Sequence, residues 1–261
     1  MSGGRIGARR DGAVGWLVFD NPERRNAVSL EMWQAIPRVL DDFGADPGVR
    51  VVVLAGAGDK AFVSGADISQ FERERANAEA VKRYEEIGER AQASLAGFDK
   101  PVIAMIRGYC LGGGLNIANL CDLRIAAEDA RFGIPAARMG LGYRASSMKK
   151  LLDIVGKAAA LEIMISARQF SAAEALALGL VHQVVPVPEL ETATRAYCDM
   201  IAANAPLTMR AAKRIIRELT QGAGYDAAAC EAWVKECFAS QDYIEGRQAF
   251  MEKRKPVFKG R

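Results

Sequence analysis

Two glycine-rich segments contain the residue types best suited to binding a negatively charged group. In the first, Gly108-Tyr-Cys-Leu-Gly112-Gly-Gly-Leu-Asn116, glycines join an apolar run at residues 101–106 to a helical pattern. Glycines let a ligand approach the backbone closely, and the first N–H groups of a helix are unpaired donors at the positive end of its dipole. Such a junction can hold a phosphate or an oxyanion.

Two nucleotide-binding motifs fit this segment poorly. A phosphate-binding loop requires Lys and Ser or Thr after its second glycine, where Gly114 and Leu115 stand. A dinucleotide fingerprint requires a third glycine at the position of Ile117. From this segment alone, an oxyanion site and close packing of a helix both remain open.

The second glycine-rich segment follows a strand-like run at residues 51–56 and contains Ser-Gly-Ala-Asp at 64–67. Two further motifs are Asn-Pro-Glu-Arg-Arg-Asn-Ala at 21–27 and Arg-Phe-Gly-Ile-Pro at 131–135. The order and spacing of these motifs and the 108–116 segment resemble the enoyl-CoA hydratase/isomerase family of the crotonase superfamily. The resemblance extends from about Val14 to Arg261.

The resemblance implies a crotonase-like α/β fold. We expect a spiral of ββα units with an acyl-CoA site over residues 1–195, and a C-terminal helical trimerisation region over residues 196–261. It also implies a homo-oligomer, either a trimer or a dimer of trimers. The expected partner is an acyl-CoA substrate, with coenzyme A present only as part of the thioester and with no metal.

In crotonase-like enzymes two backbone N–H groups bind the thioester carbonyl and stabilise the enolate that forms beside it. By the motif match these donors are Ala66 and Gly113. Donors aimed at a developing oxyanion contribute about 3 to 4 kcal/mol each to the transition state. The resemblance therefore predicts an enzyme of the lyase or isomerase class that acts through a thioester enolate.

The proton-transferring residues depart from the family pattern. Hydratases of the family hold a water molecule between two glutamates, whose positions match Asn116 and Ala136. Neither side chain exchanges a proton at neutral pH, whereas proton transfer typically contributes ~100- to 10,000-fold in rate. This substitution argues against ordinary two-glutamate hydration, and against isomerisation that depends on the second glutamate.

Tyr143 is the candidate proton donor, because certain acyl-CoA decarboxylases of the family carry a tyrosine there. A phenol with a pKa near ~10 can protonate an enolate, and decarboxylation of a malonyl-type thioester needs no base. The alternative is that Tyr143 packs on the pocket wall. We interpret Asp67 as a residue that fixes its loop, and Glu85 and Glu86 as solvated charges on a helix that borders the acyl pocket in relatives.

The resemblance also implies the coenzyme A contacts. Arg24 and the backbone near Ala27 are expected at the adenosine and phosphate end, and the segment 66–69 at the pantetheine. Phe258 and Lys259, from this or a neighbouring subunit, are expected at the adenine and 3′-phosphate. The predicted coenzyme A-binding residues are Arg24, Ala27, Ala66, Asp67, Ile68, Ser69, Phe258 and Lys259.

Composition limits the other functions. The 261 residues are 50% apolar, and 35 basic against 32 acidic side chains give a net charge of +3, so nothing favours nucleic acid or a membrane. The five cysteines form no Cys-x-x-Cys pair, which favours a cytoplasmic protein. A non-catalytic acyl-CoA- or RNA-binding member remains an alternative. The single histidine, His182, lies in an apolar run far from Ser64, so we expect a packed or surface strand residue rather than Ser/His catalysis.

Hydrophobic periodicity and turn residues predict the elements that carry these motifs. The expected strands cover residues 6–10, 14–19, 50–56, 101–106, 122–127 and 180–185. The expected helices cover 29–43, 71–96, 115–120, 149–154, 157–165 and 171–178, followed by helices between 189 and 253 with breaks near 206, 222–224 and 240. Strands that alternate with helices predict stacked parallel strands with right-handed crossovers.

Overall fold

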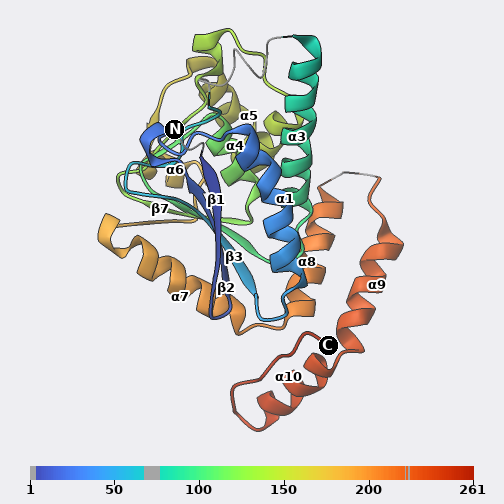
Figure 1. The fold of residues 1–261 in the computed structure, drawn as a ribbon. Helices are drawn as coiled ribbons and strands as arrows, with labels where there is room; N and C mark the ends of the chain where they lie inside the picture. Colours follow the sequence, from blue (N-terminus) through green and yellow to red (C-terminus); the bar gives the residue numbers. More distant parts are fainter. Residues whose placement is uncertain (1–3, 68–76, 221, 223) are drawn as a thin grey trace.

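The computed structural model of the protein describes residues 4–67, 77–220, 222 and 224–261. Its strands form two sheets (Figure 1), a six-stranded sheet in the order β1-β2-β3-β5-β7-β10 and a four-stranded sheet in the order β4-β6-β8-β9. The strands are β1 (Arg5–Asp11), β2 (Val14–Asp20), β3 (Val51–Gly56), β4 (Ala61–Val63), β5 (Val102–Ile106), β6 (Tyr109–Leu111), β7 (Leu123–Ala127), β8 (Arg131–Gly133), β9 (Phe170–Ser171) and β10 (Gln183–Val185).

The larger sheet is parallel apart from the predicted N-terminal hairpin. β1 pairs antiparallel with β2, and the successive pairs β2–β3, β3–β5, β5–β7 and β7–β10 are parallel. Apolar residues of β3 are buried on both faces of this sheet, as expected where a parallel sheet is covered on both sides. The predicted α/β class is therefore confirmed.

The helices lie around these two sheets. They are α1 (Leu30–Ala45), α3 (Ala78–Gly97), α4 (Gly113–Leu120), α5 (Ala145–Ser166), α6 (Ala172–Ala177), α7 (Leu190–Ala202), α8 (Pro206–Leu219), α9 (Ala227–Phe238) and α10 (Gln241–Met251), with short 3₁₀ segments η1 (Pro22–Arg24), η3 (Pro135–Met139) and η4 (Val187–Glu189). Ser29 caps α1 as predicted, because its hydroxyl accepts a hydrogen bond from the Met32 N–H. None of the described helices is both long and apolar enough to cross a bilayer.

The short strands of the smaller sheet make the chain a spiral of repeated ββα units. Each long strand is followed by a strand of three residues and then a helix, giving the units β3-β4-α3, β5-β6-α4 and β7-β8-α5. The short strands stack in parallel, with Ala61 opposite Tyr109 and Cys110 opposite Phe132. This is the predicted succession of ββα units. The short strands themselves were not predicted.

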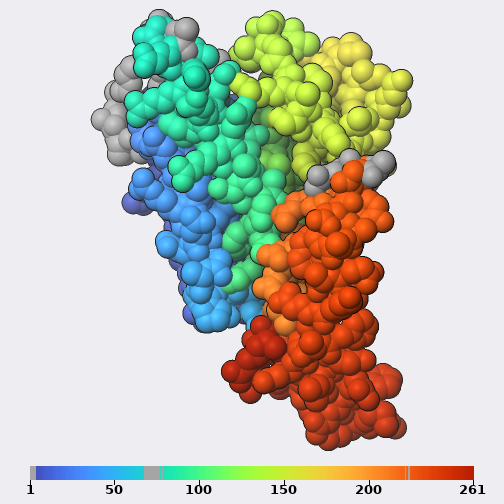
Figure 2. Space-filling model, turned by 90° about the vertical axis from the view of Figure 1, so that its right-hand side faces the viewer, coloured from blue at the N-terminus to red at the C-terminus, as the bar shows by residue number. Residues whose placement is uncertain are grey.

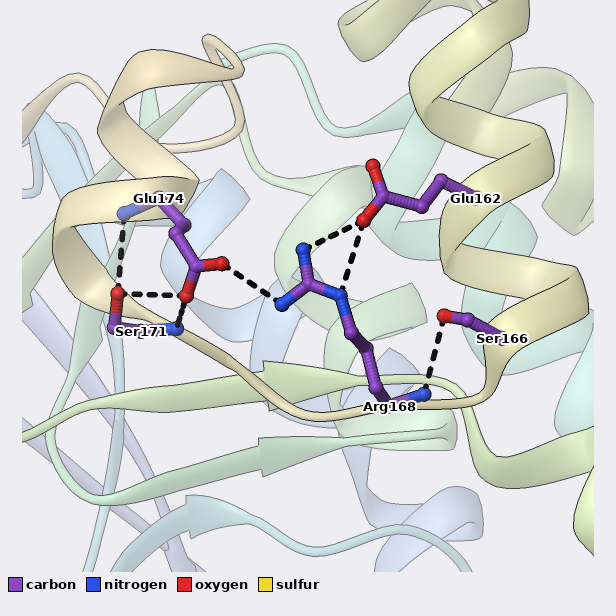
Figure 3. A network of polar contacts seen from close by, with 5 residues as sticks. All are labelled: Glu162, Ser166, Arg168, Ser171 and Glu174. Carbon is purple, nitrogen blue, oxygen red and sulfur yellow. Dashed lines mark hydrogen bonds and ion pairs between the residues drawn. The ribbon is translucent and has the colours of Figure 1, made fainter.

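A polar network follows the third ββα unit and connects α5 to α6 (Figure 3). Arg168 follows α5 and donates hydrogen bonds to Glu162 of α5 and to Glu174 of α6. Glu174 also completes the predicted capping box with Ser171. The network ties the end of α5 to the start of α6. Gly156, with a φ of +75° and a ψ of 171°, interrupts α5 between the two helices predicted at 149–154 and 157–165, so that break is confirmed. One detail differs from the prediction, since β10 is shorter than expected.

The C-terminal helices extend away from the sheets (Figures 1 and 2). α8 packs beside the sheets, whereas α9 and α10 project beyond the body of the molecule. Phe250 and Met251 of α10 are 83% and 81% exposed. The predicted boundary at residue 195 falls within α7, and the division into two domains stays a prediction.

Candidate active site

The loop after β4 presents the Ala66 N–H group. The Val28 N–H donates to the Gly65 carbonyl oxygen (2.9 Å), and the Asp67 N–H donates to the Val28 carbonyl oxygen (3.0 Å). Because the residues on either side of Ala66 make these two bonds, the N–H of Ala66 points away from Val28. Gly65 has a φ of +115°, a conformation that favours glycine.

The predicted coenzyme A segment at residues 24–27 lies directly against this loop. Arg24 Nη1 donates to both carboxylate oxygens of Asp67, at 2.8 and 3.1 Å, and the Ser64 N–H donates to the Arg25 carbonyl oxygen (3.1 Å). Asp67 is only 7% exposed. The structure therefore places Arg24, Ala27, Ala66 and Asp67 together, and Asp67 fixes its loop through an ion pair with Arg24.

Asn26 anchors the same segment, a role that sequence reasoning missed. Its side-chain Nδ2 donates to the Ala57 and Ala61 carbonyl oxygens at 2.9 and 2.8 Å, and its Oδ1 accepts from the Asn21 N–H at 3.0 Å. Asn26 is fully buried, with a φ of +56°. Asparagine tolerates this conformation better than most residues, which was the available signal.

The second amide comes from the start of α4. Gly112 precedes this helix with a φ of +52°, and its N–H donates to the Gly133 carbonyl oxygen (2.8 Å). Gly113 is the first residue of α4, so its N–H has no acceptor within the helix. A Cβ atom on Gly114 would lie 2.0 Å from the Val63 carbonyl oxygen, so only glycine lets α4 pack this closely against β4.

The two predicted amides converge. The Ala66 nitrogen lies 3.8 Å from the position that a Cβ atom on Gly113 would occupy, and the Gly113 nitrogen lies 4.0 Å from the equivalent position on Gly65. Within the described part of the chain neither amide donates a hydrogen bond. Two free donors from two different loops are thus close enough to bind one oxyanion.

Asn116 and Tyr143 lie beside these amides. The Tyr143 hydroxyl donates to the Gly112 carbonyl oxygen (3.3 Å) and makes a side-chain hydrogen bond with Asn116. Burial raises the pKa of Tyr143 well above the ordinary value for a phenol, and the bond with Asn116 opposes this rise. The phenol therefore keeps its proton at neutral pH. Asn116 Oδ1 is buried and has no hydrogen-bond partner among the described residues.

The position of the second family glutamate is apolar. Ala136 lies on η3, is 5% exposed and belongs to the main hydrophobic core. The predicted solvated carboxylate Glu85 on α3 forms an ion pair with Arg144 at 2.8 Å, next to Tyr143 in the chain. The side chains of Asn116, Ala136 and Tyr143 are thus uncharged at the positions where proton transfer is expected. We call these three residues the neutral acid–base region.

Phe258 and Lys259 lie far from this group within one chain. The Phe258 carbonyl oxygen accepts a hydrogen bond from Arg50 (3.1 Å), which immediately precedes β3, whereas the Ala66 loop comes after β3 and β4. β3 has six residues and so spans about 20 Å. A cavity of about 750 Å³ at the Arg50 end is lined by Lys259 but by none of the site residues named above. Two further predicted residues, Ile68 and Ser69, lie outside the described residues.

His182 takes no part in the site. Its Nδ1 accepts a hydrogen bond from the Arg124 N–H (3.1 Å), and its side chain is exposed beside β7 and β10. Ser64 Oγ instead donates to the Arg24 carbonyl oxygen (3.3 Å). His182 is therefore on the surface as expected, but it lies just before β10 rather than within a strand.

Comparison with known proteins decides the family. The profile described as enoyl-CoA hydratase/isomerase matches residues 9–261, nearly the whole chain. The chain belongs to the enoyl-CoA hydratase/isomerase family. It is 34% identical over 247 residues to the short-chain-enoyl-CoA hydratase of Clostridium acetobutylicum, covering 94% of both proteins.

Other members of the enoyl-CoA hydratase/isomerase family catalyse different reactions. The chain is 33% identical to a peroxisomal Delta(3,5)-Delta(2,4)-dienoyl-CoA isomerase of Arabidopsis thaliana, covering 95% of this chain and 93% of the isomerase. It also matches the crystal structure of an enoyl-CoA hydratase/carnithine racemase from Magnetospirillum magneticum, with 37% identity, a TM-score of 0.92 and coverage of 100% and 97%. The fold is therefore that of the crotonase superfamily, and family membership alone does not select one reaction.

Proposed function

We propose that this family member binds an acyl-CoA thioester and stabilises its enolate with the N–H groups of Ala66 and Gly113. The convergence of these two free amides is the observation that carries the proposal. Both amides are fixed before a ligand arrives, because β4 and α4 hold them through backbone contacts. Preorganised donors of this kind need no rearrangement as negative charge develops on the thioester oxygen.

The neutral acid–base region favours decarboxylation of a malonyl-type acyl-CoA over hydration of an enoyl-CoA. Hydration requires a base to activate water, and Asn116 and Ala136 supply none. In decarboxylation the bond between the α-carbon and the carboxylate breaks, carbon dioxide leaves, and the electron pair passes into the thioester enolate. The chemistry then requires only one proton donor.

Tyr143 is the proposed donor. Its hydroxyl donates to the Gly112 carbonyl, which belongs to the same peptide group as the Gly113 N–H, and its raised pKa keeps it protonated. Tyr143 transfers its proton to the α-carbon of the enolate, and the phenolate is reprotonated from water. A site without the two glutamates also repels a substrate carboxylate less than a hydratase site does.

Coenzyme A binding is assigned to the segment at residues 24–27 and to the C-terminus. Arg24 and Ala27 lie beside Ala66, where they can contact the phosphates and pantetheine. Phe258 and Lys259 are separated from Ala66 by the length of β3, so we assign them to the coenzyme A of a neighbouring subunit. This assignment requires a homo-oligomer, which light scattering of the purified protein tests directly.

The reaction is tested by incubating the protein with methylmalonyl-CoA and, separately, with crotonyl-CoA. We expect conversion of methylmalonyl-CoA to propionyl-CoA and carbon dioxide, with crotonyl-CoA hydration at least ~100-fold slower. Crotonyl-CoA turnover at ~1 to 1,000 per second would refute the proposal that this site, which lacks the two glutamates, does not hydrate enoyl-CoA. Tight acyl-CoA binding with turnover of neither thioester would instead identify a non-catalytic binding protein.

The cellular setting follows from the cysteines. Cys110, Cys121 and Cys198 are buried free thiols whose pKa values are raised by burial, so they stay protonated. Unpaired buried thiols suit a reducing compartment, and we propose a cytoplasmic location. Fractionation of cells that express the tagged protein tests this proposal.

A further inference from the structure

The connector that carries Tyr143 has few backbone restraints. It comprises residues 140–144, between η3 and α5, and contains two glycines. The N–H groups of Gly140 and Leu141 both donate to the Ala136 carbonyl oxygen. In the described chain, the N–H groups of the next three residues of the connector donate no hydrogen bond. The place of the Tyr143 ring therefore depends on side-chain contacts.

Arg144 supplies contacts on the other side of the connector. Its Nη2 lies 2.8 Å from Glu85 Oε2, and its Nη1 contacts Glu89 Oε1. The two glutamates are four residues apart on α3, where like charges repel each other. Arg144 neutralises both, and these carboxylates raise the pKa of its guanidinium. One side chain thus ties the connector to α3.

Consecutive side chains of the connector bind two different helices. Tyr143 reaches the start of α4, through Gly112 and Asn116, while Arg144 reaches α3. α3, α4 and α5 lie at the same end of the molecule (Figure 1), so the connector is held between them. The Arg144 carbonyl also accepts hydrogen bonds from the Ser147 and Met148 N–H groups of α5, so the two side chains fix the part of the connector that precedes this cap.

We infer that Arg144 is a positioning residue, whose ion pairs with Glu85 and Glu89 hold the Tyr143 hydroxyl beside the Gly113 amide. The inference rests on the proposed function of Tyr143 as proton donor. Arg144 itself is half exposed, and its guanidinium is paired with Glu85 and Glu89 of α3. Because exposed ion pairs are individually weak and screened by salt, this device is sensitive to ionic strength.

The first test reads the position of Tyr143 without any substrate. Tyrosine labelled with ¹³C at Cζ is followed by NMR from pH 8 to 12, and the Tyr143 signal is assigned by its loss in Tyr143→Phe. In the wild type the Tyr143 phenol should stay protonated above pH ~10, whereas in Arg144→Met it should lose its proton at a lower pH than in the wild type. Salt at ~1 M, where the screening length is about 3 Å, should move the wild type toward the variant.

Arg254→Met is the matched control. Arg254 also bridges two glutamates, Glu245 and Glu252, but it follows α10 at the opposite end of the molecule (Figure 1). It should leave the Tyr143 titration unchanged. Should Arg144→Met fail to fold, the double variant Glu85→Gln/Glu89→Gln removes the same ion pairs and keeps Arg144.

The second test uses methylmalonyl-CoA turnover. We expect Arg144→Met to lower kcat by about 10- to 100-fold with little change in KM, the loss typical of a misplaced catalytic group. The charge-reversed triple variant Arg144→Glu/Glu85→Arg/Glu89→Arg should recover most of that loss. An unchanged Tyr143 titration in both Arg144→Met and the double glutamine variant overturns the inference. A changed titration in a protein whose wild type decarboxylates nothing instead rejects the proposed function and leaves the positioning role standing.

Discussion

Replacing Gly114 with alanine should separate the two amides that are proposed to bind the thioester oxygen. The new Cβ atom would lie 2.0 Å from the Val63 carbonyl oxygen and 2.8 Å from the carbonyl carbon, whereas real contacts of this kind do not fall below 3.0 Å. α4 and β4 must therefore move apart by about 1 Å. Because Gly113 is on α4 and Ala66 follows β4, the movement widens the gap between the two donors.

The size of the effect follows from that displacement. A misplacement of about 1 Å can cost roughly 100-fold in rate, and crowding a packed interior by one methyl group costs about 1 to 3 kcal/mol of unfolding free energy. Gly114→Ala should therefore remain folded and lose about 100-fold in kcat/KM. The control is Gly97→Ala at the exposed end of α3, where the Cβ meets nothing within 4 Å. It should keep full activity and gain about 0.4 to 1 kcal/mol.

The assay uses acetoacetyl-CoA, whose enolate absorbs in the near ultraviolet. Two amides that bind an oxyanion should increase the enolate band when wild-type protein is added at neutral pH. This readout needs no proton donor, so it reports the two amides separately from Tyr143. The reasoning is refuted if folded Gly114→Ala develops the same enolate band, at the same protein concentration, as the wild type.

Three further variants probe the rest of the site. Tyr143→Phe should lower kcat ~100- to 10,000-fold but cost only about 0.5 to 1.5 kcal/mol of stability, measured by turnover and urea unfolding. Since folding raises the pKa of Tyr143, its stabilising contribution is complete below pH ~10, the unfolded value, and is lost as pH rises further, so Tyr143→Phe should unfold with less dependence on alkaline pH. The double variant Asn116→Glu/Ala136→Glu should raise crotonyl-CoA hydration by ~100-fold or more while lowering the melting temperature, because position 136 is buried. Arg24→Met should raise KM for an acyl-CoA roughly tenfold and, because it removes the ion pair with the buried Asp67, should also lower the midpoint of urea unfolding.

The long elements could be predicted from the sequence because their patterns are strong. The apolar run before Gly56, the cap at Ser29 and the capping box at Ser171 each have a local physical signal, and each is present as expected. The four-stranded sheet gave no such signal. Its strands have two or three residues, too few to show an alternation, and they are defined by pairing with distant partners.

The candidate site was predictable in its backbone part and only partly in its side chains. Ala66 and Gly113 were identified through the resemblance of two glycine motifs to the family, and the structure brings them close together, while their binding of an oxyanion stays a prediction. The anchoring by Asn26 and the ion pairs of Arg144 were not predicted. Both depend on partners distant in sequence, and an isolated Asn or Arg does not reveal such a partner.

Each turn of the spiral of ββα units contributes different residues to the candidate site. The first turn ends in the Ala66 amide, the second in the Gly113 amide with Asn116, and the third in the segment that bears Ala136 and Tyr143. In the proposed function, the two amides thus come from the first two turns, and the proton donor Tyr143 comes from the third. Substitutions in the third turn can therefore change the proposed proton donor while they leave the main-chain amides of Ala66 and Gly113 in place.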